Sequence, residues 1–242
     1  EMLNRDWSSD VCSSDLTEEV VAAATEAGVF AMEAMWTRFL PAVEAAREVV
    51  AWGRIGQVLG VQGDLCAFRP YDPTNRLWDP ATGGGAVLDL GVYVVSMAQG
   101  LLGAARDVHC VGRYAPNGVE SAATMNISYI GGGTAALTCG FDVHGPGRMT
   151  IFGTKGWVEI QPRFHHPTTI SVHRSGVLPR IIEAKQIGRG YAHELMEVSD
   201  CLLAGQTQSA TMPLADTVEV MRVLESCLKQ LGRPQEEAKV EI

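Results

Sequence analysis

The residues best placed to do chemistry lie between positions 83 and 93, where a carboxylate and a phenol are four positions apart. At that spacing Asp89 and Tyr93 share one face of a helix. Residues 86–102 are otherwise almost wholly apolar, which predicts a buried helix whose few polar groups need partners or a cavity. An acid beside a phenol in such a place indicates proton transfer, although a core tyrosine bonded to a buried aspartate would show the same pattern.

The composition predicts a water-soluble globular chain of one or two domains, since 242 residues with 46% hydrophobic side chains can bury a sizeable core. The net charge of -9 comes without a basic run, which argues against a nucleic-acid partner. No apolar run reaches the ~20 residues of a bilayer span, and no signal-like segment opens the chain. We therefore expect no membrane partner and a cytoplasmic location.

Cysteines and histidines give no sign of a metal site. The six cysteines are scattered without a C-x-x-C pair, which predicts reduced, mostly buried thiols. His165 and His166 are adjacent, and in an extended segment their rings would point to opposite faces. We expect no bound metal.

The first residues do not fit the rest of the chain. Residues 5–16 are polar and aperiodic, and residues 10–16 match the translation of a common sequencing adapter. We interpret residues 1–16 as an assembly artefact without ordered structure, the alternative being an ordinary disordered N-terminus. The protein proper is then expected to begin near Thr17.

From Thr17 onward the pattern predicts a helix over 18–27 and a short apolar strand over 29–35. A proline opens a second helix, expected over 41–52. A strand over 55–68 follows, and a long loop then leads to the glycines that precede the apolar helix.

After the apolar helix, short candidate strands recur between turn glycines. They span 107–114, 122–130, 134–143, 149–152, 157–160, 168–173 and 179–187. Two amphipathic helices, 192–204 and 214–231, end the pattern. We expect an α/β (α+β) fold, in which an open, mainly antiparallel sheet carries helices on one face.

Three segments in this order, 35–41, 83–93 and 152–156, resemble the Gfo/Idh/MocA oxidoreductases, and most of all their dihydrodiol dehydrogenase-like branch. The resemblance extends over about residues 17–232. It implies an N-terminal nicotinamide-binding Rossmann domain, which takes NAD or NADP. It also implies a C-terminal domain whose open sheet lines the substrate site and often forms a dimer.

The chain departs from the family in its first part, because no G-x-G-x-x-G turn follows a strand. We interpret residues 17–40 as a helix-strand remnant of the dinucleotide-binding domain. Residues 41–242 are then the C-terminal domain for substrate binding and oligomerisation. The catalytic lysine of the family would fall within the suspected artefact and has no counterpart.

The resemblance implies hydride transfer at a hydroxyl-bearing carbon, with Tyr93 as the proton-transferring group and Asp89 orienting or tuning it. A phenol has an ordinary pKa of about 10, so a nearby cation would have to lower it. Trp36 and Arg38, expected to end a strand at a ligand-binding sheet edge, are candidate cofactor-binding residues. A surface cation–π contact between them is an equal alternative.

The loop before the apolar helix carries the candidate substrate-binding residues Arg76 and Trp78. Pairing of Arg76 with Asp72 or Asp79 on a solvated loop is the commoner outcome.

These observations predict the C-terminal part of an NAD(P)-dependent dehydrogenase acting on a small molecule, namely a sugar, polyol or dihydrodiol. We expect the isolated chain to be inactive and to form a homo-oligomer through its open sheet. The alternative is a non-catalytic dimerisation or ligand-binding module of the same fold.

Overall fold

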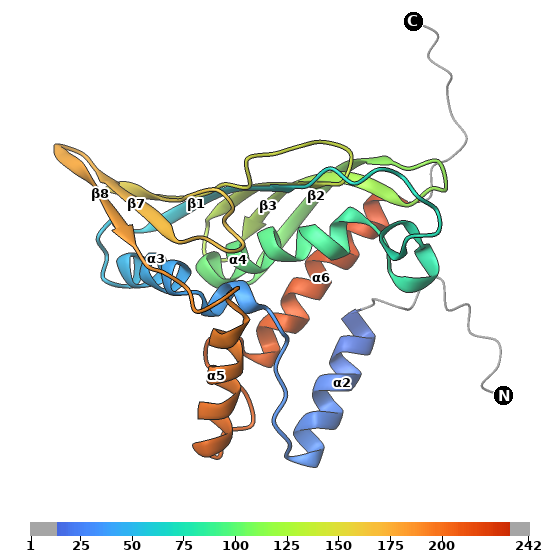
Figure 1. Cartoon of the computed structure of the whole chain (residues 1–242), viewed down its shortest axis with the longest axis horizontal. Helices are drawn as coiled ribbons and strands as arrows, with labels where there is room; N and C mark the ends of the chain where they lie inside the picture. The colour runs from blue at the N-terminus through green and yellow to red at the C-terminus, as the bar shows by residue number, and fades with distance from the viewer. Residues whose placement is uncertain (1–13, 233–242) are drawn as a thin grey trace, which may run out of the picture.

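The computed structural model describes residues 14–232, which contain one eight-stranded sheet in the order β2-β3-β4-β1-β5-β6-β7-β8 (Figure 1). The strands are β1 (Val58–Cys66), β2 (Ala105–Tyr114), β3 (Glu120–Tyr129), β4 (Thr134–Gly140), β5 (Met149–Gly153), β6 (Gly156–Ile160), β7 (Thr169–Arg174) and β8 (Val177–Glu183). Among these strands only β1 and β4 pair in parallel. The predicted open, mainly antiparallel sheet is confirmed.

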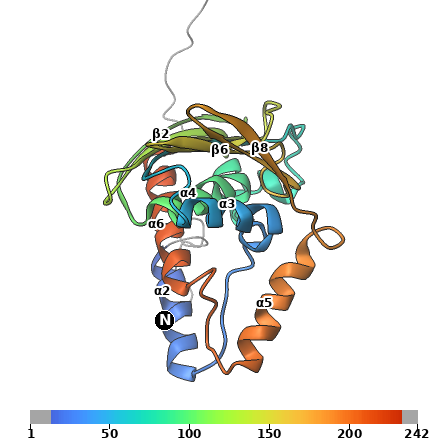
Figure 2. The ribbon, with the colours of Figure 1, turned by 90° about the vertical axis from the view of Figure 1, so that its left-hand side faces the viewer.

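The helices lie on one side of this sheet, as expected, and the other face carries none of the described helices (Figures 1 and 2). They are α2 (Ser14–Ala27), α3 (Pro41–Ala51), α4 (Val92–Leu102), α5 (Tyr191–Leu203) and α6 (Leu214–Leu231). Short helical turns add η1 (Trp36–Phe39), η2 (Arg76–Trp78), η3 (Pro80–Thr82) and η4 (Val87–Gly91). Helices α2 and α5 extend away from the sheet, whereas α3, α4 and α6 lie against or close beneath it.

The core forms between α4 and the strands above it, because alternate residues of each strand point toward the helices. On β4, Leu137 and Cys139 are fully buried, as are Val94 and Ala98 of α4. Burying each large aliphatic side chain contributes about 1.5–3 kcal/mol. The apolar helix predicted from the sequence is therefore the central helix of the fold.

One segment, Pro80–Leu102, is long and apolar enough to span a bilayer by length and composition, contrary to the expectation that no run reaches that length. More than half of its most apolar window is buried inside the protein. Burial of this kind is typical of the core helix of a water-soluble domain.

The strand predicted over 29–35 is not formed. Those residues run in extended or irregular conformation to η1, and Ala31 N donates to Thr207 O at 3.0 Å. An apolar run becomes a strand only beside a partner strand, and no described strand lies next to it. The expected helix-strand remnant keeps its helix but lacks its strand.

Helix α2 begins earlier than predicted, at Ser14. Ser14 is buried, and its hydroxyl donates to Glu225 Oε2 on α6 at 2.6 Å. Residues 14–16 are thus part of a helix, so the expectation that they lack ordered structure was wrong. Residues 1–13, which hold the rest of that segment, lie outside the described part.

Candidate functional site

The predicted catalytic phenol, Tyr93, lies at the start of α4 and contacts η1. Trp36 Nε1 donates a hydrogen bond to Tyr93 Oη at 3.1 Å. Since the phenol oxygen accepts this bond, its own O–H is left to donate to another group. Two segments that are far apart in the sequence thus meet at one phenol oxygen.

Asp89 lies one turn before Tyr93, on η4, but it is not hydrogen-bonded to the phenol. Its side chain is 27% exposed, so it is not the buried acid that the sequence predicted. Arg76 Nη2 pairs with Asp89 Oδ1 at 3.2 Å, rather than with Asp72 or Asp79. The carboxylate therefore acts on Tyr93 through its charge.

The surroundings of Tyr93 raise the pKa of its phenol above the ordinary value. Burial is the main cause, and the nearby Asp89, Tyr191 and Glu194 add to it, whereas the hydrogen bond from Trp36 opposes it. No cation among residues 14–232 contributes to lowering this pKa. Near neutral pH the phenol is therefore protonated and able to donate.

Two histidines complete one wall of the site, and the sequence did not predict this. The peptide at 164–166 forms a turn rather than an extended segment, so the rings of His165 and His166 lie together, with centroids 4.4 Å apart. His165 is 6.0 Å from the Tyr93 ring, and His166 stacks on Trp36 at 6.3 Å. Adjacent histidines point apart only in an extended chain, which is why the expectation was wrong.

His165 is held in its neutral form. Burial, with the nearby His166 and Arg163, lowers the pKa of His165 to about 4. Its Nδ1 atom is buried without a hydrogen-bond partner. A neutral imidazole nitrogen in that state can bind a ligand hydroxyl.

Helix α5 contributes to the site through its first turn. The Tyr191 ring lies 4.6 Å from Trp36, and Glu194 Oε2 is buried without a partner. Burial raises the pKa of Glu194. The only sequence signal for these residues is that segment 190–194 shares the resemblance to the Gfo/Idh/MocA oxidoreductases.

A family model described as the GFO/IDH/MocA C-terminal domain matches residues 43–159. The trans-1,2-dihydrobenzene-1,2-diol dehydrogenase of Mus musculus is 32% identical over 226 residues, covering 88% of this chain and 66% of that enzyme. The chain belongs to the Gfo/Idh/MocA family. It spans about two thirds of the length of the curated relatives, which are named as dehydrogenases.

Solved structures agree with this Gfo/Idh/MocA membership. The aldose-aldose oxidoreductase from Caulobacter crescentus, complexed with glycerol, is 26% identical with a TM-score of 0.79, covering 90% of this chain and 66% of that one. Levoglucosan dehydrogenase, in complex with NADH and levoglucosan, has a TM-score of 0.79 at 19% identity, covering 90% and 68%. The second likeness shows the fold alone.

Arg38, a predicted cofactor-binding residue of this Gfo/Idh/MocA chain, is buried and bonded within the protein. It lies in η1 rather than at a strand end, and its side chain is 5% exposed, so it makes no surface contact. Its guanidinium donates to Asp216 Oδ2 at 2.5 Å, and also to Ser96, Gln99 and Thr211 O. All three of its nitrogens therefore have protein partners.

The two predicted substrate-binding residues differ in their surroundings. Trp78 is 2% exposed, donates to Pro70 O at 3.1 Å and packs edge-on against Phe141. Arg76 is 73% exposed and reaches Asp89. The structure thus brings Arg76 to the site and places Trp78 in the core.

The Gfo/Idh/MocA membership implies a nicotinamide dinucleotide, and the described residues do not fit its phosphates. The glycine-rich turn at 83–85 precedes a helix, but the amide of Val87 at the helix start already donates to the Glu120 carboxylate at 3.2 Å. That negative charge would repel a pyrophosphate. Within residues 14–232 no group of three or more potential metal ligands is found either.

Proposed function

We propose that this chain is the substrate domain of an NAD(P)-dependent oxidoreductase that moves hydride between nicotinamide and a hydroxyl-bearing carbon. The substrate would be a sugar, a polyol or a dihydrodiol. The observation that carries the proposal is the Tyr93 phenol, held by Trp36 Nε1 beside two unpartnered buried atoms, His165 Nδ1 and Glu194 Oε2. The similarity to a trans-1,2-dihydrobenzene-1,2-diol dehydrogenase and to an aldose-aldose oxidoreductase supports it.

In the proposed reaction Tyr93 moves the proton at its Oη atom. When a carbonyl is reduced, the protonated phenol donates to the new alkoxide, and the bond from Trp36 stabilises the phenolate that remains. A nicotinamide cofactor would be held by residues outside the described range, and it would supply or accept the hydride. In the oxidation direction the raised pKa of Tyr93 is unfavourable, so a cation from elsewhere would have to assist.

The rest of the site would recognise a ligand with several hydroxyls. His165 Nδ1 and Glu194 Oε2 are buried without partners, and ligand hydroxyls would satisfy them once the surrounding side chains move to admit the ligand. Tyr191, which is 51% exposed and lies beside the buried Trp36, offers an aromatic ring to the apolar face of a sugar or a dihydrodiol.

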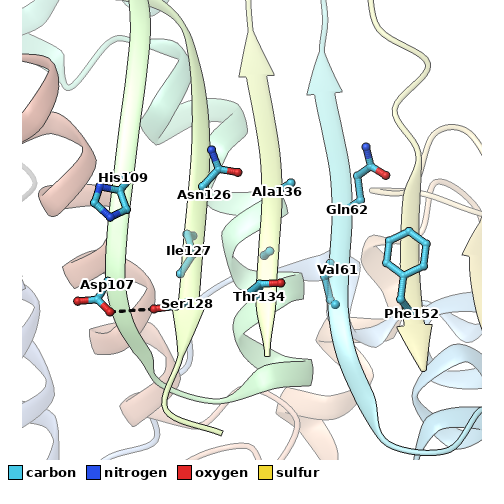
Figure 3. A pocket seen from close by; sticks show the side chains of 12 residues that line it. Val61, Gln62, Asp107, His109, Asn126, Ile127, Ser128, Thr134, Ala136 and Phe152 are labelled. Atoms are coloured by element: carbon cyan, nitrogen blue, oxygen red, sulfur yellow. Dashed lines mark hydrogen bonds between the residues drawn. The ribbon is translucent and has the colours of Figure 1, made fainter. Parts of the chain in front are cut away.

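A homo-oligomer is proposed to form through the uncovered face of the sheet. An open hollow of about 570 Å³ lies on this face over β1 to β5. Figure 3 shows side chains that line it, among them Gln62, His109 and Phe152. Beside it, Phe152 pairs across strands with Trp157, whose ring stacks on His173 at 4.5 Å. Exposed aromatic rows of this kind are typical of protein interfaces.

The experiment that tests the function starts from the complete reading frame of the source DNA. The expressed protein is assayed by nicotinamide absorbance with a panel of sugars and diols. We expect turnover, and we expect Tyr93→Phe to lower kcat by about 10²–10⁴-fold, because it removes the transferable proton. Tyr114→Phe is the control, because that hydroxyl donates to Leu231 O away from the site.

Two outcomes would contradict the proposal. Unchanged turnover in Tyr93→Phe would leave the family membership but remove the role of Tyr93. A complete frame without a dinucleotide-binding domain, and without turnover, would favour the alternative of a non-catalytic dimerisation or ligand-binding module.

A further inference from the structure

The proposed chemistry makes no use of the buried carboxylate of Glu120, at the start of β3. Glu120 is 8% exposed, and its Oε1 accepts from Val87 N at 3.2 Å. Val87 is the first residue of η4, the π-helical turn that runs into α4. Glu120 therefore holds the first turn of the helix that carries Asp89 and Tyr93.

Gly85 fits against the same carboxylate. Its φ of +127° is a conformation that L side chains rarely adopt. A Cβ at Gly85 would lie 1.9 Å from Glu120 Oε1, so no larger residue can occupy this position while Glu120 stays in place. The backbone at 85 and the Glu120 carboxylate are thus matched in shape.

The contact between Gly85 and Glu120 lies where three parts of the fold meet, namely the loop that carries Arg76, the helical turn η4 and the sheet. On one side, Gly85 N donates to Leu77 O at 2.9 Å, which connects it to the turn that presents Arg76. On the other side, a Cβ at Gly91 would meet Cys139 Sγ at 3.3 Å, so η4 packs closely on β4. A shift of the turn at 85–87 would therefore be transmitted to both Arg76 and Tyr93.

Keeping a carboxylate in this place is unfavourable for folding. Burial raises the pKa of Glu120 to about 7, against two backbone hydrogen bonds that lower it. The titratable groups that face it are Cys110 and Tyr114 on β2 and Cys139 on β4, none of which is a cation. Unfavourable groups of this kind are expected where function requires them.

We propose that Glu120 is a positioning residue, which sets the place of Tyr93 against Trp36 by holding the start of the helix at Val87. The role in catalysis rests on the proposed function, whereas the placement of the two side chains does not. In that function Tyr93 transfers the proton and Trp36 hydrogen-bonds its phenol oxygen, whereas Glu120 acts only through their placement.

The test uses the 242-residue chain labelled with ¹⁵N and observes the indole N–H signal of Trp36. The signal is assigned from its loss in Trp36→Phe. The variant Tyr93→Phe shows where the Trp36 signal lies when the indole N–H has no phenol acceptor. Gln230→Ala is the matched control, because the Gln230 side chain hydrogen-bonds Cys110 N and Val108 O on β2 and Ser226 on α6.

We expect Glu120→Ala to move the Trp36 signal at least about halfway toward its position in Tyr93→Phe. Glu120→Gln, which keeps an acceptor oxygen, and Gln230→Ala are expected to leave it unmoved. An unmoved signal in Glu120→Ala, with a thermal midpoint lowered as in Gln230→Ala, would overturn the proposal. If Glu120→Ala does not fold, the test uses Glu120→Asp, whose shorter side chain cannot reach Val87 N. An unmoved Trp36 signal in Glu120→Asp would likewise overturn the proposal.

The second arm measures turnover in the protein expressed from the complete reading frame. We expect Glu120→Ala to lower kcat by about 10-fold or more, with KM within about 3-fold, because the proton donor is misplaced while the ligand contacts remain. A rise in KM alone would contradict the positioning role. Absence of wild-type turnover would count against the proposed function. The indole measurement would still test whether Glu120 places Tyr93 against Trp36.

Discussion

The surroundings of the Tyr93 phenol favour its protonated form. It accepts one hydrogen bond, from Trp36, and no cation among the described residues offsets the burial that raises its pKa. A phenol in this state is a proton donor, which suits reduction of a carbonyl better than oxidation of an alcohol. In the proposed reaction, the direction favoured at neutral pH would therefore depend on charges outside the described residues.

His165 is expected to bind the substrate rather than to transfer its proton. In the complete enzyme, His165→Phe should raise KM by about 2–10-fold, the effect of one lost hydrogen bond, with little change in kcat. Because the pKa of His165 is lowered to about 4, the wild-type KM should show no titration of this group between about pH 5.5 and 8. Steady-state kinetics over that range check both expectations.

The control for this prediction is His144→Phe, which alters a histidine that lies near Phe68, outside the site. A fall in kcat at constant KM in His165→Phe would instead assign His165 to proton transfer.

At the scale of elements, local patterns predicted the strands and missed the turns that bring residues together. Alternating residues between glycines located all seven strands from β2 to β8, because a half-buried strand has a period of two. The prediction of a strand at 29–35 was wrong because a strand forms only beside a partner strand, which the local sequence does not specify. The turn at 164–166 and the first turn of α5 join the site through tertiary contacts, so His165 and Glu194 could not be placed from spacing alone.

Arg38 is expected to connect elements rather than to bind the cofactor. It lies in η1 and bonds Ser96 and Gln99 of α4 and Asp216 of α6, so Arg38→Leu leaves Asp216 without its ion partner. We expect a loss of about 3–5 kcal/mol in the free energy of unfolding, measured by denaturant titration. Arg76→Leu, which removes an exposed arginine, should change it by no more than about 0.5–1 kcal/mol.

The opposite result would restore the cofactor-binding hypothesis for Arg38. In that case Arg38→Leu would keep its unfolding midpoint and raise the KM for the nicotinamide cofactor in the complete enzyme.

At the scale of the whole molecule, the helices leave one face of the sheet uncovered (Figure 2). If that face joins two copies, Trp157→Glu should convert the oligomer to a monomer in sedimentation experiments, because it places a charge in the aromatic row. Trp52→Glu is the control, since Trp52 is exposed and follows α3 on the helical side. An oligomer that survives Trp157→Glu unchanged would exclude this face as the interface.

The stability of the whole molecule should depend on pH through Glu120. Its pKa of about 7 in the folded protein is above the ordinary value near 4.5, so the folded state holds the proton more tightly than the unfolded state. Stability from this group is therefore present below about pH 4.5 and is lost as pH rises through 7, with an effect on the order of 3 kcal/mol. In the Glu120→Gln variant this position cannot ionise. The free energy of unfolding of the variant should therefore fall less between pH 4.5 and 8 than that of the wild-type protein. The two denaturant series differ only in this carboxylate, which cancels the contributions of the other titrating groups. Parallel curves would mean that Glu120 titrates normally, and that the carboxylate at the start of the helix is better hydrated than its burial indicates.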